Sequence, residues 1–452
     1  MSAMTPLEQQ LLAEIQHRQN QVSTPIQRYW IAYSGGVDSH VLLFALSRIR
    51  MQLNSSEILA VHIDHQLSPL SPQWSAHCRQ VCLELQIPYQ CLVVDAKAVS
   101  GESPEAKARQ VRYEAFTALL KTGDCLLTAH HQDDQAETLL LQLLRGAGPR
   151  GLAAMPGHNP FAKGNLCRPL LNVSREQILQ YARQHQLQWI DDISNDDPVF
   201  DRNFLRLHVI PLLKQRWPAM SKTLSRSAQL CADTIGMIDA VASEDLRNLV
   251  DTSSERLSIS RLQTLSRERQ HNAVRAWLAQ LRLACPSQKT LHHIWSQVID
   301  TLPESAPRLQ WPGAEIRRYR DHLYAMPTMA DFDHNQRITW DLKHELVIAG
   351  VGRIRAVPES GQGLARRNLS DISIRFRQGG ERCKLPKRGG EHSLKNLFQE
   401  MGIVPWMRDR IPLIYSGEQL AAIGDLLVCD GFSAGEQEEG LHCVCDYEQP
   451  VR

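Results

Sequence analysis

A glycine-rich hexapeptide, residues 34–39, combines residue types that can bind phosphate. Glycines lack Cβ atoms, so backbone N–H groups can approach phosphate oxygens, and serine hydroxyls add further donors. An apolar stretch at residues 29–33 precedes the hexapeptide and a helical pattern begins at His40, which is the order that places phosphate at a helix N-terminus. The six residues are Ser34, Gly35, Gly36, Val37, Asp38 and Ser39.

The acid in this hexapeptide limits what the loop can bind. Asp38 would repel a bare phosphate, so it indicates either Mg²⁺ beside the phosphates or a carboxylate that stabilises the first turn of a helix. The segment is neither a Walker A loop nor a GxGxxG loop. A plain tight turn between a strand and a helix is the alternative for a glycine pair considered alone.

Acidic residues cluster after a second apolar run, residues 125–129. Asp134 and Glu137 are three positions apart, and Asp133 and Glu137 are four apart, so either pair shares a face on a helix. Two carboxylates near a helix start can hold Mg²⁺ while ATP phosphates and waters fill the other positions. A solvated helix with acids in its first turn is the alternative.

A basic segment lies near the C-terminus. Residues 375–410 contain nine basic and four acidic side chains, a local balance of +5. Such an excess predicts contacts with the phosphates of a nucleic acid, and the alternative is a solvated charged face. The candidate contacts are Arg377, Arg382, Lys384, Lys387, Arg388, Lys395 and Arg408.

Composition excludes several classes of protein. The 452 residues are 43% hydrophobic and 22% charged, and no apolar run approaches the roughly 20 residues of a membrane-spanning helix. The first 16 residues lack the basic and apolar regions of a secretory signal, so we expect a cytoplasmic protein. The eleven cysteines show no paired CxxC spacing typical of a zinc or iron–sulfur site, and most are expected to be buried thiols.

The elements that must position these residues divide into three expected domains. Short apolar runs at residues 29–33, 58–63, 89–94, 125–129 and 167–171 alternate with helical patterns, which predicts a doubly wound α/β domain with a parallel sheet over residues 1–217. Helical patterns predict a mostly helical middle domain over residues 218–328. Strand-like runs beyond it predict a small mixed α/β domain over residues 329–452.

Longer motifs resemble a known family. The hexapeptide resembles the SGGxDS loop of the N-type ATP pyrophosphatases of the PP-loop superfamily, which cleave ATP to AMP and pyrophosphate. Residues 130–148 resemble the HxxDDQxET and RGxG motifs of the tRNA(Ile)-lysidine synthetase family. The likeness covers both ends of the chain and is weaker in the middle, and Val404 stands where the family often has proline. Further matches lie at residues 60–65, 109–116, 168–171, 192–195, 202–206, 377–382, 394–400 and 405–408.

The resemblance implies an activity and its substrates. Such an enzyme joins free L-lysine to carbon 2 of the wobble cytidine in the CAU anticodon of an isoleucine tRNA, through an adenylated cytidine, and forms lysidine. Codon recognition changes from AUG to AUA and aminoacylation from methionine to isoleucine. ATP and Mg²⁺ are the implied cofactors, the C-terminal domain is the implied tRNA-binding domain, and no protein partner is evident.

The resemblance also implies roles for individual residues. The hexapeptide and the segment with His62 would bind ATP, and Asp38, Asp134 and Glu137 would hold Mg²⁺. Asp134 and Glu137 are both candidates for the base that deprotonates lysine, and His65 and His130 are weaker candidates for the site. The expected catalytic residues are Asp38, Asp134, Glu137, Arg112, Asn195 and Arg206.

Other functions remain open at the level of sequence. A tRNA thiolase of the same superfamily commonly needs a cysteine pair near the loop, and an amide-forming relative needs a glutaminase domain; neither is found. A tRNA-binding or nucleotide-sensing protein without catalysis is a different class, against which the intact acids argue.

Overall fold

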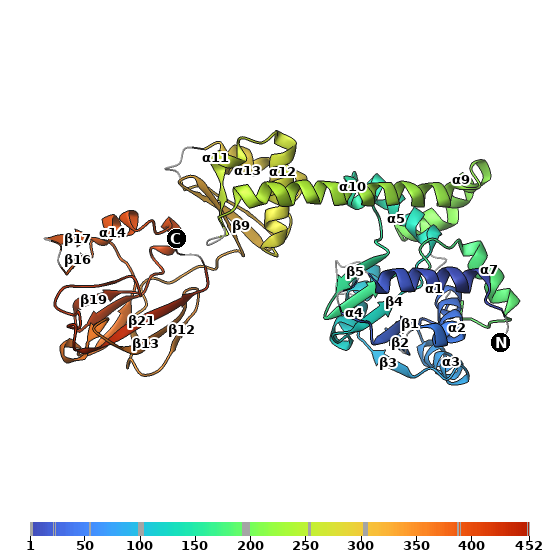
Figure 1. Cartoon of the computed structure of the whole chain (residues 1–452), viewed down its shortest axis with the longest axis horizontal. Helices are drawn as coiled ribbons and strands as arrows, with labels where there is room; N and C mark the ends of the chain where they lie inside the picture. The colour runs from blue at the N-terminus through green and yellow to red at the C-terminus, as the bar shows by residue number, and fades with distance from the viewer. Residues whose placement is uncertain are drawn as a thin grey trace. The chain divides into compact units, whose positions relative to one another are not determined.

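The computed structural model describes residues 3–20, 22, 24–53, 56–97, 104–191, 199–251, 255–301, 306–386, 388, 390–449 and 451. The chain divides into two compact units, Met1–Met237 and Ile238–Arg452, which Figure 1 colours from blue to green and from green to red. Within the described residues, no helix has the length and apolar character needed to cross a membrane.

The first unit is built on a six-stranded sheet with the order β3-β2-β1-β4-β6-β5. Neighbouring strands pair in parallel from β3 to β6, and the edge strand β5 runs antiparallel to β6. A central β1 with crossovers to both sides is the doubly wound arrangement that the sequence predicts. The strands are β1 (Arg28–Ala32), β2 (Glu57–Asp64), β3 (Tyr89–Val93), β4 (Asp124–Leu127), β5 (His158–Phe161) and β6 (Gly164–Cys167).

Helices cover both faces of this sheet. Tyr29 and Ile31 of β1 pack in the core that includes α1, α2 and α7, whereas Trp30 packs on the opposite face with Phe116 of α4. Successive side chains of a strand point to opposite faces, so one strand supplies both cores. The helices are α1 (Pro6–Gln19), α2 (Val37–Ile49), α3 (Ser71–Glu84), α4 (Pro104–Leu119), α5 (Gln132–Leu144), α6 (Pro149–Leu152), α7 (Arg175–Gln184), α8 (Asp201–Phe204) and α9 (Ile210–Arg216), with short helical turns η1 (Arg50–Gln52) and η3 (Leu205–Val209).

The predicted strand at residues 167–171 is wrong in position. The strand is β6, which ends at Cys167. Pro169 has no N–H to donate to a sheet, and the N–H of Arg168 bonds to the carbonyl of Gly157 at 2.8 Å, so the chain turns away after Cys167. The other four predicted strands coincide with β1 to β4 within two residues at each end.

The second unit begins within α10 (Met220–Leu249) and contains a four-stranded antiparallel sheet with the order β7-β10-β9-β8. The helical patterns of the sequence correspond to α10 and α12, and the sheet was not predicted, because its strands are short and β8 and β9 carry arginines. The elements are α11 (Ile259–Leu262), α12 (Arg267–Gln280), α13 (Gln288–Ile294), η4 (Trp295–Ile299), β7 (Leu257–Ser258), β8 (Arg308–Trp311), β9 (Ala314–Tyr319) and β10 (His322–Met326).

The C-terminal part of this unit is mainly antiparallel sheet. A five-stranded sheet has the order β11-β15-β18-β19-β20, a four-stranded sheet has the order β12-β13-β21-β14, and β16 pairs with β17 as a hairpin. The elements are β11 (Ile338–Thr339), β12 (Leu346–Ile348), β13 (Gly352–Ser360), β14 (Leu364–Ala365), η6 (Arg366–Asn368), β15 (Ile372–Arg375), β16 (Arg382–Lys384), β17 (Glu391–Ser393), α14 (Leu394–Glu400), η7 (Pro405–Met407), β18 (Leu413–Ser416), β19 (Gln419–Ile423), β20 (Leu427–Val428) and β21 (Glu439–Tyr447).

One cysteine pair departs from the expectation of free thiols. Cys383 of β16 and Cys429 form a disulfide across 46 residues of sequence, a separation that gives no local signal. Cys443 and Cys445, which share a strand, are free.

Candidate active site

The hexapeptide forms the turn from β1 into α2. The N–H of Ser34 donates to Oγ of Ser39 at 3.2 Å, and Oγ of Ser39 donates to the carbonyl of Gly36 at 3.0 Å. Gly35 has a φ of +89°, and a Cβ atom there would lie 2.7 Å from Cδ1 of Ile190. The loop is therefore closed by its own serines and requires glycine at position 35.

The start of α2 leaves donors available. Gly36 is the N-cap residue and provides no side-chain acceptor, so the first-turn N–H groups are not satisfied by a capping side chain. Partial positive charge at this end of a helix favours an anion. Phosphate binding by residues 34–39 stays a prediction from the sequence.

Asp38 lies in the first turn of α2 and faces the acidic helix α5. Its Oδ1 atom is buried and has no hydrogen-bond partner among the described residues. Nε2 of His131 lies 3.6 Å from Oδ1 of Asp38 and 3.4 Å from Oδ2 of Asp134. The loop and the acidic helix therefore converge on one imidazole.

His131 and Asp134 cap the N-terminus of α5. Nδ1 of His131 accepts the N–H of Asp133 at 3.2 Å, and Oδ2 of Asp134 accepts the N–H of His131 at 3.0 Å, which completes a reciprocal capping box. Burial lowers the pKa of His131, but the neighbouring Asp38 and Asp134 outweigh it and raise that pKa overall. Burial likewise raises the pKa of Asp134, but His131 and nearby cations hold it below the usual range.

Two arginines bind the second acid of α5. Nε of Arg206 donates to Oε1 of Glu137 at 2.8 Å, and Nε of Arg202 donates to Oε2 at 2.9 Å. Arg206 also reaches Oδ1 of Asp134 at 3.2 Å, and these acids raise the pKa of its guanidinium further against the effect of burial. Glu137, with only 2% of its side chain exposed, is thus saturated by Arg202 and Arg206.

A π-helical turn places these arginines. Arg202 lies on α8, Arg206 lies in η3, a π-helix, and α9 follows directly. Pro211 has no N–H to bond the carbonyl of Leu207, and the N–H of Ile210 bonds the carbonyl of Leu205 instead, five residues back. The turn leaves both arginines on the side that faces α5.

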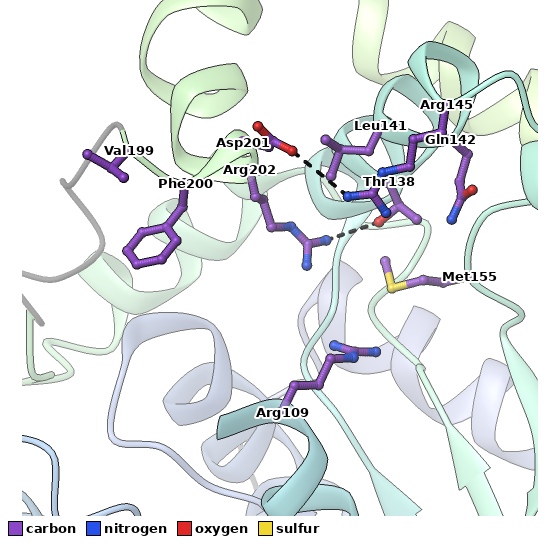
Figure 2. A pocket seen from close by; sticks show the side chains of 10 residues that line it. All are labelled: Arg109, Thr138, Leu141, Gln142, Arg145, Met155, Val199, Phe200, Asp201 and Arg202. Carbon is purple, nitrogen blue, oxygen red and sulfur yellow. Dashed lines mark hydrogen bonds and ion pairs between the residues drawn. The ribbon is translucent and has the colours of Figure 1, made fainter. Parts of the chain in front are cut away.

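A cavity of about 410 Å³ adjoins the acidic helix (Figure 2). Arg109, Arg145 and Arg202 line it together with the apolar side chains of Phe200 and Met155. Figure 2 shows Arg202 directed at Thr138, to which it donates at 3.0 Å. The cavity combines cations, an aromatic ring and apolar surface, as a site for an anionic ligand with an aromatic base would.

Other predicted residues lie around the carboxyl end of β2. His62 is buried and its Nδ1 pairs with the carbonyl of Tyr33 at 2.9 Å, so its side chain supports the strand that leads into the loop. Nε of Arg112 donates to Nε2 of His65 at 3.3 Å, and burial, then the Arg112 charge, lower the pKa of His65 to about 4. His130 pairs with Thr128, and Asn195 lies outside the described residues.

Comparisons with known proteins identify the family of this chain. Family models match as a PP-loop domain over residues 7–213, a TilS substrate binding domain over residues 257–324 and a TilS substrate C-terminal domain over residues 372–445. A tRNA(Ile)-lysidine synthase of Coxiella burnetii is 40% identical and covers 92% of this chain and 93% of its own length. The chain belongs to the tRNA(Ile)-lysidine synthase family. A second relative of that name, from Serratia proteamaculans, is 42% identical over 91% of this chain and 93% of its own.

Membership of the tRNA(Ile)-lysidine synthase family makes the chain an ATP-dependent ligase with a PP-loop ATP-binding domain. Among solved structures, a U34-tRNA thiolase of Methanococcus maripaludis is similar at 15% identity, with a TM-score of 0.42, and covers 50% of this chain and 79% of its own.

The basic residues predicted to bind tRNA lie in the second unit, and acids accompany most of them. Arg382 pairs with Glu391 at 3.1 Å and Lys384 pairs with Asp430 at 2.9 Å, so the β16–β17 hairpin carries balanced pairs. Arg377 pairs with Asp409 and Arg388 with Glu400. Arg408 donates to the carbonyl of Ile403 and to the hydroxyl of Tyr319, and Lys387 lies outside the described residues.

The sequence analysis did not single out three residues of this site. Arg202 shares a helical face with Arg206 at a spacing of four, a signal that was available. Lys214 binds Asp133 at 2.6 Å from α9, and His131 joins Asp38 to Asp134. Arg202 meets Glu137 across 65 positions, Lys214 meets Asp133 across 81 and His131 meets Asp38 across 93, and no local sequence pattern indicates such pairing.

Proposed function

We propose that this chain joins free L-lysine to carbon 2 of the wobble cytidine in an isoleucine tRNA with a CAU anticodon. The observation that carries the proposal is the convergence of Asp38 and Asp134 on His131 beside a phosphate-type loop, at the start of the helix α5 whose later residues line an arginine-rich cavity. The relatives named tRNA(Ile)-lysidine synthase support the choice of tRNA. A tRNA substrate also supports action in the cytoplasm.

The first step activates the base. A carbonyl oxygen is a poor leaving group, so O2 of the cytidine attacks the α-phosphorus of ATP, the bond from the α-phosphorus to its bridging oxygen breaks, and pyrophosphate leaves. The first-turn amides of α2 with Ser34 and Ser39 would hold the pyrophosphate, and the backbone of β2 near His62 would hold the adenosine. Arg112 would stabilise phosphate charge at the end of β2.

The second step forms the new bond. The ε-amine of lysine attacks carbon 2, AMP leaves with the former carbonyl oxygen, and one proton passes from the amine to a carboxylate. The ordinary pKa of lysine is about 10.4, so the site must favour the neutral amine. Asp134 and Glu137 are the proposed acceptors, Arg202 and Arg206 orient Glu137, and Asn195 is a proposed substrate contact.

The side chains present fit Mg²⁺ at the loop. Oδ1 of Asp38 is buried without a hydrogen-bond partner, and Oδ2 of Asp134 lies beside the same imidazole. Bound there, Mg²⁺ would neutralise charge on the ATP phosphates. The described residues hold no ready group of three ligands, so ATP and waters would complete the octahedron. Glu137 could ligate only if an arginine released it.

We propose that the chain has three functional regions. Residues 1–217 form the catalytic domain, residues 218–328 contact substrate, and residues 329–452 bind tRNA. Phosphate contacts by Arg377, Arg382, Lys384, Lys387, Arg388, Lys395 and Arg408 would require several of the ion pairs of the free protein to exchange partners.

One experiment tests the proposed reaction. The full chain is incubated with ATP, MgCl₂, an unmodified CAU tRNA transcript and radiolabelled lysine, and the label in precipitated tRNA is counted. We expect incorporation that requires ATP and the wobble cytidine, and release of one pyrophosphate per lysine. The same tRNA with uridine at the wobble position is the matched control.

A variant ties this reaction to the loop. Asp38→Asn should lower the rate of pyrophosphate release at least about a hundredfold. This is the usual effect of removing one group that stabilises charge in a transition state. Its affinity for tRNA should stay within twofold. Incorporation of label from ammonia or sulfide in place of lysine would contradict the proposed function.

A further inference from the structure

Residues 202–232, which run from α8 into α10, form a basic stretch without a single acid. The stretch contains six lysine and arginine side chains, although the whole chain has 50 basic and 49 acidic residues. Three of the six pair with acids of α5, and these are Arg202, Arg206 and Lys214. The other three form no ion pair within the described part of the chain, and these are Arg216, Lys222 and Arg226.

An exposed aromatic ring lies among these free cations. Trp217, between α9 and α10, is 58% exposed, and none of the other eight tryptophans, all of which the structure describes, is an exposed residue. The guanidinium carbon of Arg216 lies 6.0 Å from the centre of the Trp217 ring. The ring is therefore available to a partner that also meets positive charge.

The first turns of α10 extend the same basic surface. Lys222 and Arg226 are four positions apart, so they share one face of the helix. Both are exposed, whereas Ser221 and Ser225, one position earlier in each turn, are buried. The two cations thus face solvent while the serines pack inward.

This surface begins beside the acids of the proposed site. Lys214 of α9 binds Asp133 at 2.6 Å, and Arg206 binds Glu137 at 2.8 Å, so the chain on either side of the start of α9 is fastened to α5. With seven residues, α9 is only about 10 Å long. A strand of nucleic acid with one base in the site would therefore have its neighbouring nucleotides near Arg216 and Trp217.

The chemistry of the surface fits single-stranded RNA. Phosphates pair with free cations, and an unstacked base can stack on an exposed indole. A second copy of this chain fits less well, because a symmetric contact would place cations of one surface against the same cations of the other. The basic residues predicted near the C-terminus must exchange carboxylate partners before they bind phosphate, whereas Arg216, Lys222 and Arg226 need no such exchange.

We propose that Arg216, Trp217, Lys222 and Arg226 form a contact surface, the α9–α10 surface, for the unpaired anticodon-loop nucleotides next to the wobble cytidine. Trp217 stacks on one base, and the three cations bind phosphates of the same strand. The inference rests on the tRNA substrate of the proposed function. All four residues fall within 214–256, between the matched PP-loop domain and the matched substrate binding domain.

Variants of the full chain separate stacking from charge, and α10 offers matched controls. Trp217→Ala removes the ring, and Trp217→Phe keeps an aromatic face. Leu230→Ala is the control for the loss of an exposed apolar side chain of α10. The double variant Lys222→Ala, Arg226→Ala removes two cations, and its control is Arg247→Ala, which removes an exposed cation without an ion pair among the described residues from the last turn of the same helix.

The readout is fluorescence anisotropy of a labelled, unmodified CAU tRNA, and of its isolated anticodon stem-loop, at several KCl concentrations. Trp217→Ala should weaken binding of both RNAs about tenfold, the scale of losing one stacked base, and Trp217→Phe should recover most of that loss. The double variant should flatten the slope of log Kd against log salt by about 1.4, because each phosphate contact with a single strand contributes about 0.7. Leu230→Ala and Arg247→Ala should bind as the unmodified chain does.

Every other pattern of results overturns the inference. Unchanged affinity in Trp217→Ala, or a weakening seen with whole tRNA and absent with the stem-loop, would show that the anticodon loop does not contact this ring. Loss of self-association in Trp217→Ala, measured by sedimentation with tRNA affinity unchanged, would assign the surface to a second copy of the chain.

The same measurements distinguish this inference from the proposed function. Weaker tRNA binding in Trp217→Ala, in a chain that does not incorporate lysine, would support the α9–α10 surface and contradict the proposed reaction. Normal lysine incorporation with unchanged binding in Trp217→Ala would contradict the surface alone. Absence of CAU tRNA binding by the unmodified chain would overturn both.

Discussion

At the scale of single residues, the two glycines of the loop differ in whether the backbone and the surrounding atoms require glycine. Gly35 adopts a φ of +89°, and a Cβ there would lie 2.7 Å from Ile190 and 3.1 Å from Sγ of Cys78. Gly36 has a φ of −72°, and its nearest neighbour for a Cβ is Oγ of Ser34 at 3.6 Å. Only the first position demands glycine on steric grounds.

A pair of alanine substitutions tests this difference. Gly35→Ala should lower the free energy of unfolding by about 2 kcal/mol, since left-handed backbone and a steric contact both oppose a Cβ there. Gly36→Ala should cost less than about 1 kcal/mol as an N-cap change. Urea unfolding of both variants measures the difference, and equal costs would show that the loop relaxes freely around Ile190.

Residue types and spacing predicted the loop and the acids of α5, but not the partners of those acids. Asp38 and Asp134 were assigned from motifs within the hexapeptide and the acidic segment. The saturation of Glu137 by Arg202 and Arg206 depends on a π-turn set by Pro211, which places α8 and η3 against α5. Such a contact depends on tertiary packing. The spacing of Arg202 and Arg206 shows that they share a helix face, but it does not show what that face contacts.

At the scale of elements, α1 shows how a helix is fastened to the catalytic domain. Glu8 of α1 is buried, accepts the hydroxyl of Tyr181 on α7 at 2.7 Å, and pairs with Arg48 on α2. Burial alone raises the pKa of Glu8, but the Thr5 N–H, Tyr181 and Arg48 outweigh it and lower that pKa below 4.5. One carboxylate therefore ties together three helices of one face.

Glu8→Gln should lower the free energy of unfolding at pH 7 by about 2 kcal/mol, because hydrogen bonds to a charged group are lost. The folded-state pKa is depressed, so the contribution is complete above pH 4.5 and disappears as the pH falls through the folded-state value. The two proteins should thus converge in stability in acid. Glu14→Gln on the same helix removes a partly buried i,i+4 pair with Arg18 and should cost less than about 1 kcal/mol.

A constant difference between Glu8→Gln and the unmodified chain from pH 7 to pH 3 would contradict the ionised state of Glu8. Urea unfolding across this range provides the measurement. The comparison also explains a limit of sequence-based prediction. No local pattern indicates how α1 is attached, because its contacts through Glu8, Arg48 and Tyr181 join residues as far as 173 positions apart.

At the scale of the whole molecule, the parallel sheet was predictable and the antiparallel sheets were less so. Buried parallel strands read as continuous apolar runs, and four of five were located within two residues. The sheet β7-β10-β9-β8 was missed because charged residues interrupt the apolar pattern of its strands. Arg308 and Arg317 form ion pairs with the buried Glu315. A strand that buries an acid paired with arginines lacks the apolar pattern by which strands are predicted from sequence.

The same pairing bears on how the second unit would hold tRNA. The +5 balance of residues 375–410 counts charges along the chain, yet acids outside that segment, Glu418 and Asp430, pair with Arg375 and Lys384. Phosphates would have to replace these carboxylates as partners. Surface pairs contribute little to stability, so the exchange is inexpensive in free energy.

Salt dependence of tRNA binding decides whether that exchange occurs. Arg382 is 58% exposed and pairs with Glu391, and Arg353 of β13 is 63% exposed and pairs with Glu345, so the two arginines are matched in exposure and pairing. If Arg382 contacts a phosphate, Arg382→Ala should flatten the slope of log Kd against log salt by about 0.9, the value for one counterion released. Arg353→Ala should leave the slope unchanged. Fluorescence anisotropy of labelled CAU tRNA at several KCl concentrations measures both, and equal slopes for the two variants would move the phosphate-binding surface away from the β16–β17 hairpin.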